Sequence, residues 1–162
     1  MIIAGIDEAG YGPLLGPLVV GCCAFEVRTD APADSPPCLW KRLGRILSRS
    51  RGKSGRKLHV NDSKLVYSPS IGLKELERSI LAFAALPGDG PADLDALLDR
   101  VAPGCRGEVA AHPWYAPRAD ERFPLEADAV SIRIFAHSLR AEMDRAGVSC
   151  PHLSAAVVPE RQ

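Results

Sequence analysis

The chain lacks the long apolar run that a membrane-spanning helix needs. None of its apolar segments approaches the roughly 20 consecutive residues required to cross a bilayer, although 46% of the 162 residues are hydrophobic. No basic region precedes the apolar residues at the N-terminus, so a secretory signal peptide is not indicated either. The sequence therefore predicts a cytoplasmic protein without a membrane partner.

Cysteine and histidine are sparse and are not arranged as a zinc site. The five cysteines are odd in number, no C-x-x-C spacing occurs, and the four histidines stand singly. Cys22 and Cys23 are adjacent within an apolar segment. Free, buried thiols are the expected state of the cysteines, and any bound metal is expected to have oxygen ligands.

The chain has no net charge, with 20 basic and 20 acidic residues, but these charges are unevenly distributed. Residues 41–57, here called the basic segment, contain no acidic residue. Its basic residues are Lys41, Arg42, Arg45, Arg49, Arg51, Lys53, Arg56 and Lys57. A separate cationic segment beside a carboxylate site is suited to holding a polyanion. A solvated, flexible loop is the alternative that the spacing leaves open.

Residues 2–27 contain the most specific pattern in the chain. An apolar run of strand length ends at Asp7 and Glu8, a turn rich in glycine and proline follows, and a longer apolar run leaves the turn. Because Asp7 continues a hydrophobic strand, we expect its carboxylate to be partly desolvated. Adjacent strand residues point to opposite faces, so the two acids share one metal ion only if the backbone twists or bulges there. A solvated strand end is the alternative reading.

Two phosphate-binding loops are excluded at this turn. Gly5 and Gly10 have the spacing of a P-loop, but Tyr11 and Gly12 stand where lysine and serine or threonine are required. The glycines at 10, 12 and 16 are one residue too widely spaced for a dinucleotide fingerprint, and the neighbouring prolines oppose a helix.

The run GIDEAGYGPLLGPLVV, residues 5–20, resembles the N-terminal motif of type 2 ribonucleases H (ribonuclease HII). That motif has Asp-Glu-Ala-Gly, a Gly-Arg-Gly triplet and Gly-Pro-hydrophobic, in this order. A second segment, NDSKL at residues 61–65, resembles the family's Asn-Asp-Ser-Lys segment. The two matches occur in the family's order, although they cover a small part of the chain.

The resemblance implies an endonuclease that hydrolyses the RNA strand of RNA–DNA hybrids and uses Mg²⁺ or Mn²⁺. Asp7 and Glu8 would be catalytic, as two of the family's four metal-binding carboxylates. The resemblance also implies an α/β fold of ribonuclease H type, in which a mixed sheet has flanking helices. We expect a single domain over residues 1–162, acting as a monomer on the hybrid duplex.

The same resemblance implies six substrate-binding residues. These are Gly10, Tyr11 and Gly12 at the sugar-phosphate backbone, and Asp62, Ser63 and Lys64 along the nucleic-acid groove. Tyr11 replaces the arginine of the Gly-Arg-Gly triplet and removes a cationic contact. We therefore expect the substitution to affect preference for a single embedded ribonucleotide more than hydrolysis itself.

The spacing of apolar residues predicts the remaining elements. Helices are expected over residues 39–47, 68–86, 94–101 and 127–146, the last ending at Gly147. The buried face of the second helix is expected to comprise Leu73, Leu76, Ile80, Phe83 and Ala84. The apolar run at 153–158 is typical of a parallel strand covered on both faces. Residues 102–124 read as an irregular insertion, whose Trp114 and Tyr115 either stack on bases or pin the loop to the core.

The family's third and fourth carboxylates have no clear counterparts in this sequence. Glu160 is the acid just after the last expected strand, whereas Asp120, Glu126 and Asp128 are better explained as acids near a helix N-terminus. We expect the N-terminal portion of a ribonuclease H-like domain, incomplete at its C-terminus, or a degenerate homologue. The alternatives are a catalytically incomplete module that binds nucleic acid without cleaving it, and an assembly fragment completed by another chain.

Overall fold

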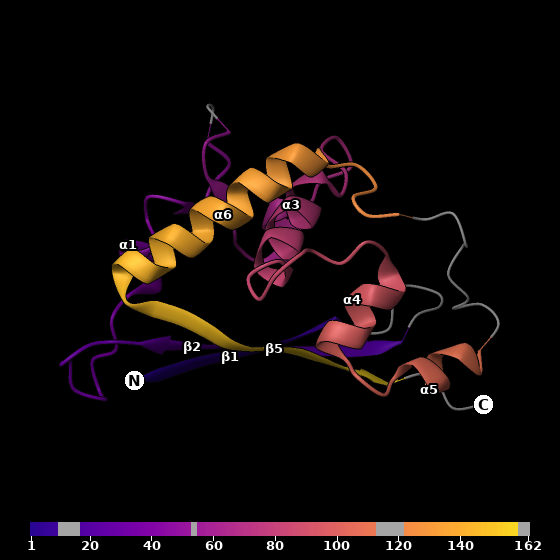
Figure 1. The fold of residues 1–162 in the computed structure, drawn as a ribbon, viewed down its shortest axis with the longest axis horizontal. Helices are drawn as coiled ribbons and strands as arrows, with labels where there is room; N and C mark the ends of the chain where they lie inside the picture. The colour runs from indigo at the N-terminus through magenta and orange to yellow at the C-terminus, as the bar shows by residue number, and fades with distance from the viewer. Residues whose placement is uncertain (10–16, 53–54, 113–121, 159–162) are drawn as a thin grey trace.

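A three-stranded antiparallel sheet forms the base of the molecule. The computed structural model describes residues 1–9, 17–52, 55–112 and 122–158. The sheet has the order β1-β2-β5, with β1 at Ile2–Ala9, β2 at Leu18–Val27 and β5 at Val148–Val158. Both neighbouring pairs are antiparallel. Figure 1 shows these strands seen edge-on, with α3 and α6 together on one side of them.

Six helices and a second, two-stranded sheet complete the described chain. The helices are α1 (Leu39–Arg42), α2 (Ser63–Val66), α3 (Lys74–Ala84), α4 (Leu94–Val101), α5 (Arg106–Ala110) and α6 (Ala129–Ala146). The short strands β3 (Leu47–Ser48) and β4 (Leu58–His59) pair in parallel. This mixed α/β architecture agrees with the predicted α/β class and is compatible with a ribonuclease H-like fold. The predicted mixed sheet is not found among the described residues, because both strand pairs of the main sheet are antiparallel and the parallel pair β3-β4 forms a separate sheet. Within the described residues, no helix is long and apolar enough to span a membrane.

The core lies between the sheet and helices α3 and α6. Ile3 and Phe25, which are paired across β1 and β2, both pack against the core. Phe25 meets Phe83 of α3 edge to face, with ring centroids 6.2 Å apart. Because strand side chains alternate, the even-numbered residues of β1 face away from the helices. Ile2 and Ile6 are accordingly 61% and 73% exposed.

The prediction of a parallel last strand covered on both faces was wrong. β5 begins at Val148, earlier than expected, and runs antiparallel to β2. Its outer side is open to solvent, where Val158 is 44% exposed. A continuous apolar run shows that a strand is partly buried, but its direction depends on which strand it pairs with. Here the pairing partner is β2.

Two expected helices are shorter than the apolar spacing indicated. The first ends at Arg42, because the following backbone pairs with β4: Leu58 N–H donates to Ile46 O and Val60 N–H donates to Ser48 O. The second begins only at Lys74, because Gly72 has a positive φ of 66° that a helix does not accommodate.

The buried face of α3 also differs from the prediction. Leu73 and Ile80 are 42% and 52% exposed, whereas Glu75 and Ser79 are buried. Ser79 Oγ donates a hydrogen bond of 2.9 Å to the carbonyl of His59 in β4. α3 is therefore rotated so that Ser79 faces β4, where the His59 carbonyl satisfies its hydroxyl, whereas buried Glu75 is paired with Arg78 of the same helix.

The predictions for α4 and α6 are confirmed. α4 covers residues 94–101 and is capped by Asp93, whose carboxylate accepts from Ala96 N–H. α6 is capped by Asp128 and ends at Gly147, which adopts the left-handed conformation. Gly147 then leads directly into β5.

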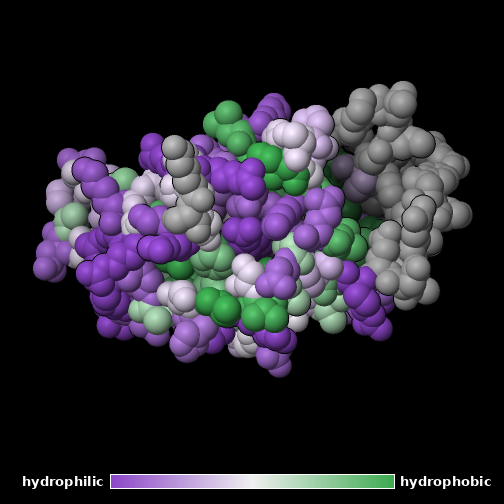
Figure 2. Space-filling model, turned by 90° about the horizontal axis from the view of Figure 1, so that it is seen from above, coloured by the Kyte–Doolittle hydropathy of each residue, from purple (hydrophilic) through white to green (hydrophobic). Residues whose placement is uncertain are grey.

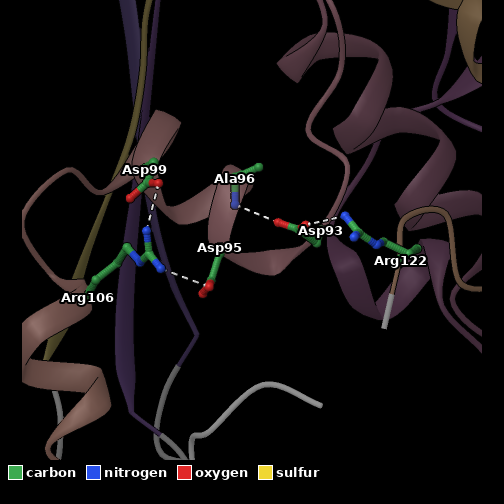
Figure 3. A network of polar contacts seen from close by, with 6 residues as sticks. All are labelled: Asp93, Asp95, Ala96, Asp99, Arg106 and Arg122. Atoms are coloured by element: carbon green, nitrogen blue, oxygen red, sulfur yellow. Dashed lines mark hydrogen bonds and ion pairs between the residues drawn. The ribbon is translucent and has the colours of Figure 1, made fainter. Parts of the chain in front are cut away.

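An ion-pair network joins α4 to α5, a short helix within residues 102–124, which were expected to be irregular (Figure 3). Arg106 of α5 lies between two carboxylates of α4, 2.9 Å from Asp95 and 3.0 Å from Asp99. Arg122 lies 2.9 Å from Asp93, the residue that caps α4. These acids are therefore engaged in holding the segment together.

Candidate functional site

Asp7 and Glu8 lie near the end of β1 in a regular strand. Pairing continues through Asp7↔Gly21 and Glu8↔Val20 without a bulge in β1. Side-chain alternation therefore assigns Asp7 to the helix-covered face and Glu8 to the outer face. The Oδ1 atom of Asp7 accepts a hydrogen bond of 3.0 Å from Glu8 N–H.

The expectation that Asp7 is partly desolvated was wrong, since both acids are exposed. Among the strands that the structure describes, β1 is at the edge of its sheet and pairs with β2 alone. Core packing is concentrated around Ile3, near the start of the strand, rather than around Asp7. Within the described chain, neither acid forms an ion pair, so both carboxylates are available to a ligand.

A divalent metal ion fits these two residues by donor chemistry but not by geometry. Carboxylate oxygens are the ligands that Mg²⁺ and Mn²⁺ prefer. However, the regular alternation of β1 separates the two carboxylates, and the described residues contain no group of three or more His, Cys, Asp or Glu that is able to hold a metal ion. The described part of the chain therefore does not assemble a shared metal centre.

Several predicted site residues lie outside the described residues. These are Gly10, Tyr11 and Gly12 of the expected backbone contact, Asp120 and Glu160 among the carboxylates, and Trp114 and Tyr115 of the aromatic segment. Their roles stay predictions. Asp128 caps α6, and Glu126 accepts a hydrogen bond from Leu73 N–H, so both act as structural acids near a helix start.

The second motif segment forms a capped helix start. Asp62 precedes α2 and accepts from Lys64 N–H at 2.9 Å, while Ser63 is the first helical residue. All three side chains are exposed. The structure thus places Asp62, Ser63 and Lys64 together on the surface, where they are able to contact a ligand.

Asn61 joins this capped helix to the basic segment. Its side-chain amide donates to Arg49 O at 2.8 Å, and its Oδ1 accepts from the N–H of Asp62. Nε2 of His59 lies 3.2 Å from the same Arg49 carbonyl. The structure therefore brings two of the predicted nucleic-acid-binding segments into one region.

The start of the basic segment lies at the opposite end of β1 from the two acids. Arg42 of α1 donates to the carbonyls of Arg28 and Ala146, and this corner also contains the Met1–Val27 backbone pair. At about 3.4 Å per residue, β1 carries Asp7 roughly 17 Å away from Ile2. Hydrophilic residues cover much of the molecule's upper face (Figure 2).

Sequence reasoning missed a buried polar cluster between β4 and α3. Glu75, which is 3% exposed, pairs with Arg78 at 3.1 Å, and the Arg78 guanidinium lies over the ring of Phe135. His59 is also buried, at 6% exposure. The available signal was the i,i+3 spacing of Glu75 and Arg78, which alone indicates only a common surface pair.

The cysteines are free thiols, but they are less buried than predicted. Four are partly exposed and Cys38 is exposed. Burial is the main cause that raises the pKa of Cys23 and of Cys150 above the ordinary value. A raised pKa leaves less thiolate at neutral pH, so these two side chains are not suited to act as nucleophiles.

Three known proteins are similar to this chain, and each is called ribonuclease HII. The protein of Gluconobacter oxydans (strain 621H) is 27% identical over 147 residues, or 89% of this chain and 66% of the relative. That of Chlamydia abortus is 36% identical over 77 residues, or 48% of this chain and 32% of the relative. That of Methanocaldococcus jannaschii is 63% identical over 30 residues, or 18% of this chain and 12% of the relative.

These matches span at most 66% of the length of the relatives. No protein-family model matches the chain. No solved structure matches it either.

Proposed function

We propose, from the premise that this chain is a divergent, ribonuclease HII-like protein, that it is a metal-dependent endonuclease hydrolysing the RNA strand of RNA–DNA hybrids. Asp7 and Glu8 are the proposed catalytic residues and metal ligands. Gly10, Tyr11, Gly12, Asp62, Ser63 and Lys64 are the proposed substrate contacts. Mg²⁺ or Mn²⁺ is the proposed cofactor.

One observation supports this proposal above the others: Asp7 and Glu8 are exposed at the end of β1 and form no ion pair with any residue that the structure describes. Most other clustered acids of the described chain have structural partners, as Asp93, Asp95 and Asp99 do in Figure 3. Carboxylates that the fold leaves uncommitted are available for chemistry. Their position at the motif turn is the one that the family resemblance implies.

A divalent ion, when bound, neutralises phosphate charge and activates water. Because the described residues do not complete a site for such an ion, no step of the reaction is assigned to it. The chain's own residues have separate proposed roles. Asp7 provides negative charge at the reacting end, by which we mean the end of β1 where Asp7 and Glu8 lie. The basic segment and the exposed Lys64 bind backbone phosphates at a distance from that end.

Gel-resolved cleavage of an RNA–DNA hybrid tests this function. Wild type, Asp7→Asn and a control, Glu26→Gln, are compared with Mg²⁺, Mn²⁺ or EDTA; Glu26 is an exposed carboxylate of the same sheet. We expect metal-dependent cutting by wild type and the control, with nearly none by Asp7→Asn. Equal cutting by Asp7→Asn would remove Asp7 from the mechanism. A duplex with one embedded ribonucleotide, run in parallel, tests the effect of Tyr11.

A second candidate is a module that binds nucleic acid without cleaving it. It is favoured by the lack of a metal-binding cluster among the described residues, combined with the connection of the basic segment to α2 through Asn61. This function requires affinity that falls with salt but no hydrolysis. Each lost phosphate contact reduces the slope of log K against log salt by about 0.9.

Salt titrations of hybrid binding test the second candidate. We expect a shallower slope when Arg49, Arg51 and Arg56 are changed to alanine, but not when Arg106 and Arg122 of the α4–α5 network are changed. An unchanged slope in the first variant would show that the basic segment does not contact the backbone. Tight, salt-sensitive binding without cutting would favour the module over the endonuclease.

A further inference from the structure

Arg49 of the basic segment lies against an aromatic ring. Its guanidinium carbon is 5.1 Å from the centroid of the Trp40 ring. Trp40 belongs to α1, is partly buried and packs against the hydrophobic core, so the ring is itself fixed in place. A cation over the face of an indole is attracted by the negative face of the ring. The side chain of Arg49 is therefore held in position, although the residue is exposed.

The main chain of Arg49 is fixed as well. Its carbonyl accepts a hydrogen bond of 2.8 Å from the side-chain amide of Asn61, and Nε2 of His59 lies 3.2 Å from the same oxygen. The preceding residue, Ser48, pairs with His59 in the parallel ladder of β3 and β4. Arg49 is thus anchored at its backbone and at its guanidinium group.

These anchors leave the hydrogen-bond donors of the Arg49 guanidinium unused. Arginine has five N–H donors in a planar fork, and a ring contact of this kind occupies none of them. Among the residues that the structure describes, no carboxylate and no carbonyl accepts from this group. Arg49 therefore presents a positioned cation whose donors are open to a ligand.

Other cations of the basic segment lack one of these two properties. Arg42 and Lys57 donate to backbone carbonyls, and Arg51 lies 3.9 Å from a carboxylate of α3. Arg56 has no partner within the described part of the chain, but no ring contact holds it there either. Arg49 is both held and uncommitted, which distinguishes it from an arginine that is only solvated.

A phosphate of a nucleic-acid backbone is the ligand that suits this arrangement. The planar guanidinium matches phosphate oxygens through paired N–H donors. An arginine that is already ordered loses less side-chain freedom on binding. The basic segment contains no acidic residue, so it suits a ligand with repeated negative charges rather than a single anion.

We infer that Arg49 binds a phosphate of the nucleic-acid backbone and that Trp40 is its positioning residue. The guanidinium donates to phosphate oxygens from its place over the ring. Asn61 connects this contact to the capped start of α2, where Lys64 is exposed. The inference rests on the proposed function, because its ligand is the nucleic acid proposed there, but it does not involve Asp7 or Glu8.

Salt titrations of hybrid binding separate the roles of the two residues. Anisotropy of a labelled RNA–DNA hybrid is measured with EDTA present, so that no cleavage occurs. We expect Arg49→Gln to weaken binding about tenfold and to reduce the slope of log K against log salt by about 0.9, since one phosphate contact is lost. We expect Trp40→Leu to weaken binding about threefold with an unchanged slope, because the charge remains while its order is lost.

Two control variants and one double variant sharpen this test. Arg106→Gln should change neither affinity nor slope, because the donors of Arg106 are committed to α4. Arg56→Gln should weaken binding less than Arg49→Gln does. In the Trp40→Leu background, Arg49→Gln should weaken binding only about threefold further, because the positioned contact is already impaired.

The contrary outcomes are equally definite. If Trp40 and Arg49 form a contact that only stabilises the fold, Arg49→Gln and Trp40→Leu bind the hybrid as wild type does, and the inference is overturned. Equal losses in Arg49→Gln and Arg106→Gln would overturn it as well. A loss in Arg56→Gln as large as that in Arg49→Gln would show that the ring gives Arg49 no advantage.

An NMR measurement on the wild-type chain avoids any disturbance of the fold from replacing Trp40, which packs against the core. We expect the Nε–H resonance of Arg49 to shift when the hybrid is added in EDTA, and that of Arg106 to stay in place. An Arg49 resonance that the hybrid does not move would contradict the contact.

Heparin, a sulfated polysaccharide, separates a nucleic-acid site from a general polyanion site. We expect Arg49→Gln to weaken hybrid binding more than heparin binding, and an equal loss with heparin would overturn the nucleic-acid assignment. The proposed endonuclease is judged separately, by cleavage with wild type and Asp7→Asn. Cleavage by wild type with unchanged hybrid binding in Arg49→Gln would overturn this inference alone. Binding that depends on Arg49 without any cutting would overturn the endonuclease alone.

Discussion

The two acids at the end of β1 and the acid Glu75 in α3 occupy opposite environments. Asp7 and Glu8 are exposed and have no ion pair among the described residues, whereas Glu75 is 3% exposed and paired with Arg78. A buried charge without a partner is strongly unfavourable, so Glu75 is bound to its arginine by the fold. The exposed acids lack such a role. We therefore expect replacement of Asp7 or Glu8 to affect function, and replacement of Glu75 to affect stability.

The largest expected effect is on activity at the end of β1. We predict that Asp7→Asn lowers hybrid cleavage at least about a thousandfold, or roughly 4 kcal/mol, with no loss of stability. If Glu8 serves the same reaction, the double variant Asp7→Asn/Glu8→Gln is no slower than Asp7→Asn, because groups acting as a unit are not additive. Single-turnover cleavage rates measure this. If the rate loss of the double variant equals the product of the losses of the two single variants, the two acids act separately, as their positions on opposite faces of β1 allow.

The next effect is on stability at the buried pair. We predict that Glu75→Gln lowers the free energy of unfolding by about 3 kcal/mol, because it leaves Arg78 buried without a counter-charge. Urea unfolding measures the change, with the exposed Glu108→Gln as control. Replacing Glu75 and Arg78 together by leucine should restore much of the loss. If the double replacement is worse than Glu75→Gln, the charge imbalance is not the cause.

A smaller effect is expected where α3 begins. Gly72 has φ 66°, and a Cβ atom there would lie 2.3 Å from Oε2 of Glu126, which accepts from Leu73 N–H. We predict that Gly72→Ala lowers the free energy of unfolding by about 1–2 kcal/mol. Gly88→Ala is the control, since its added Cβ would meet nothing within 4 Å. Equal stabilities of the two variants would mean that Gly72 does not fix the start of α3.

The smallest effect is expected at a pair in which the glutamate is buried but the arginine is half-exposed, Glu142 being 7% exposed. Glu142 and Arg145 share the i,i+3 spacing of Glu75 and Arg78, but the Arg145 side chain is 49% exposed against 12% for Arg78. Hydrogen bonds from Arg145 lower the pKa of Glu142 below its ordinary 4.5. The pair therefore stabilises the fold above pH 4.5, and this contribution is lost as the pH falls through the folded-state pKa.

Unfolding measurements at pH 7 and pH 3 check this sign. We predict that Glu142→Gln is slightly less stable than wild type at pH 7, by much less than Glu75→Gln, and that the difference shrinks at pH 3. The same difference at both values would show that the charge of Glu142 contributes nothing.

Some elements were predictable because their signals are local. α6 was predicted from a repeat of three and four residues that ends at Gly147, and the structure has the same helix with a left-handed Gly147. The capped start of α2 is equally local, since Asp62 accepts from the N–H of Lys64, two residues further along the chain. In such cases the residues that specify the structure are neighbours in the chain.

Other features were not predictable because their partners are distant in the chain. The apolar pattern of α3 assigned Ile80 to the core, yet Ser79 is buried there because His59 offers it an acceptor. The desolvation expected for Asp7 depended on how far the helices cover β1, which the strand pattern does not contain. The proposed metal site was not predictable for the same reason, since its carboxylates must come from segments that are distant in the chain.

The sequence by itself determined the resemblance to ribonuclease HII, the strands that flank the motif turn, and the helices with clear caps. Each depends on residue identity or on spacing within one segment. Only the tertiary structure decided the antiparallel direction of β5, the exposure of Asp7 and Glu8, and the hydrogen bond that joins Arg49 to Asn61. These depend on which distant segments meet, because pairing and burial are properties of the packed chain rather than of any one stretch of it.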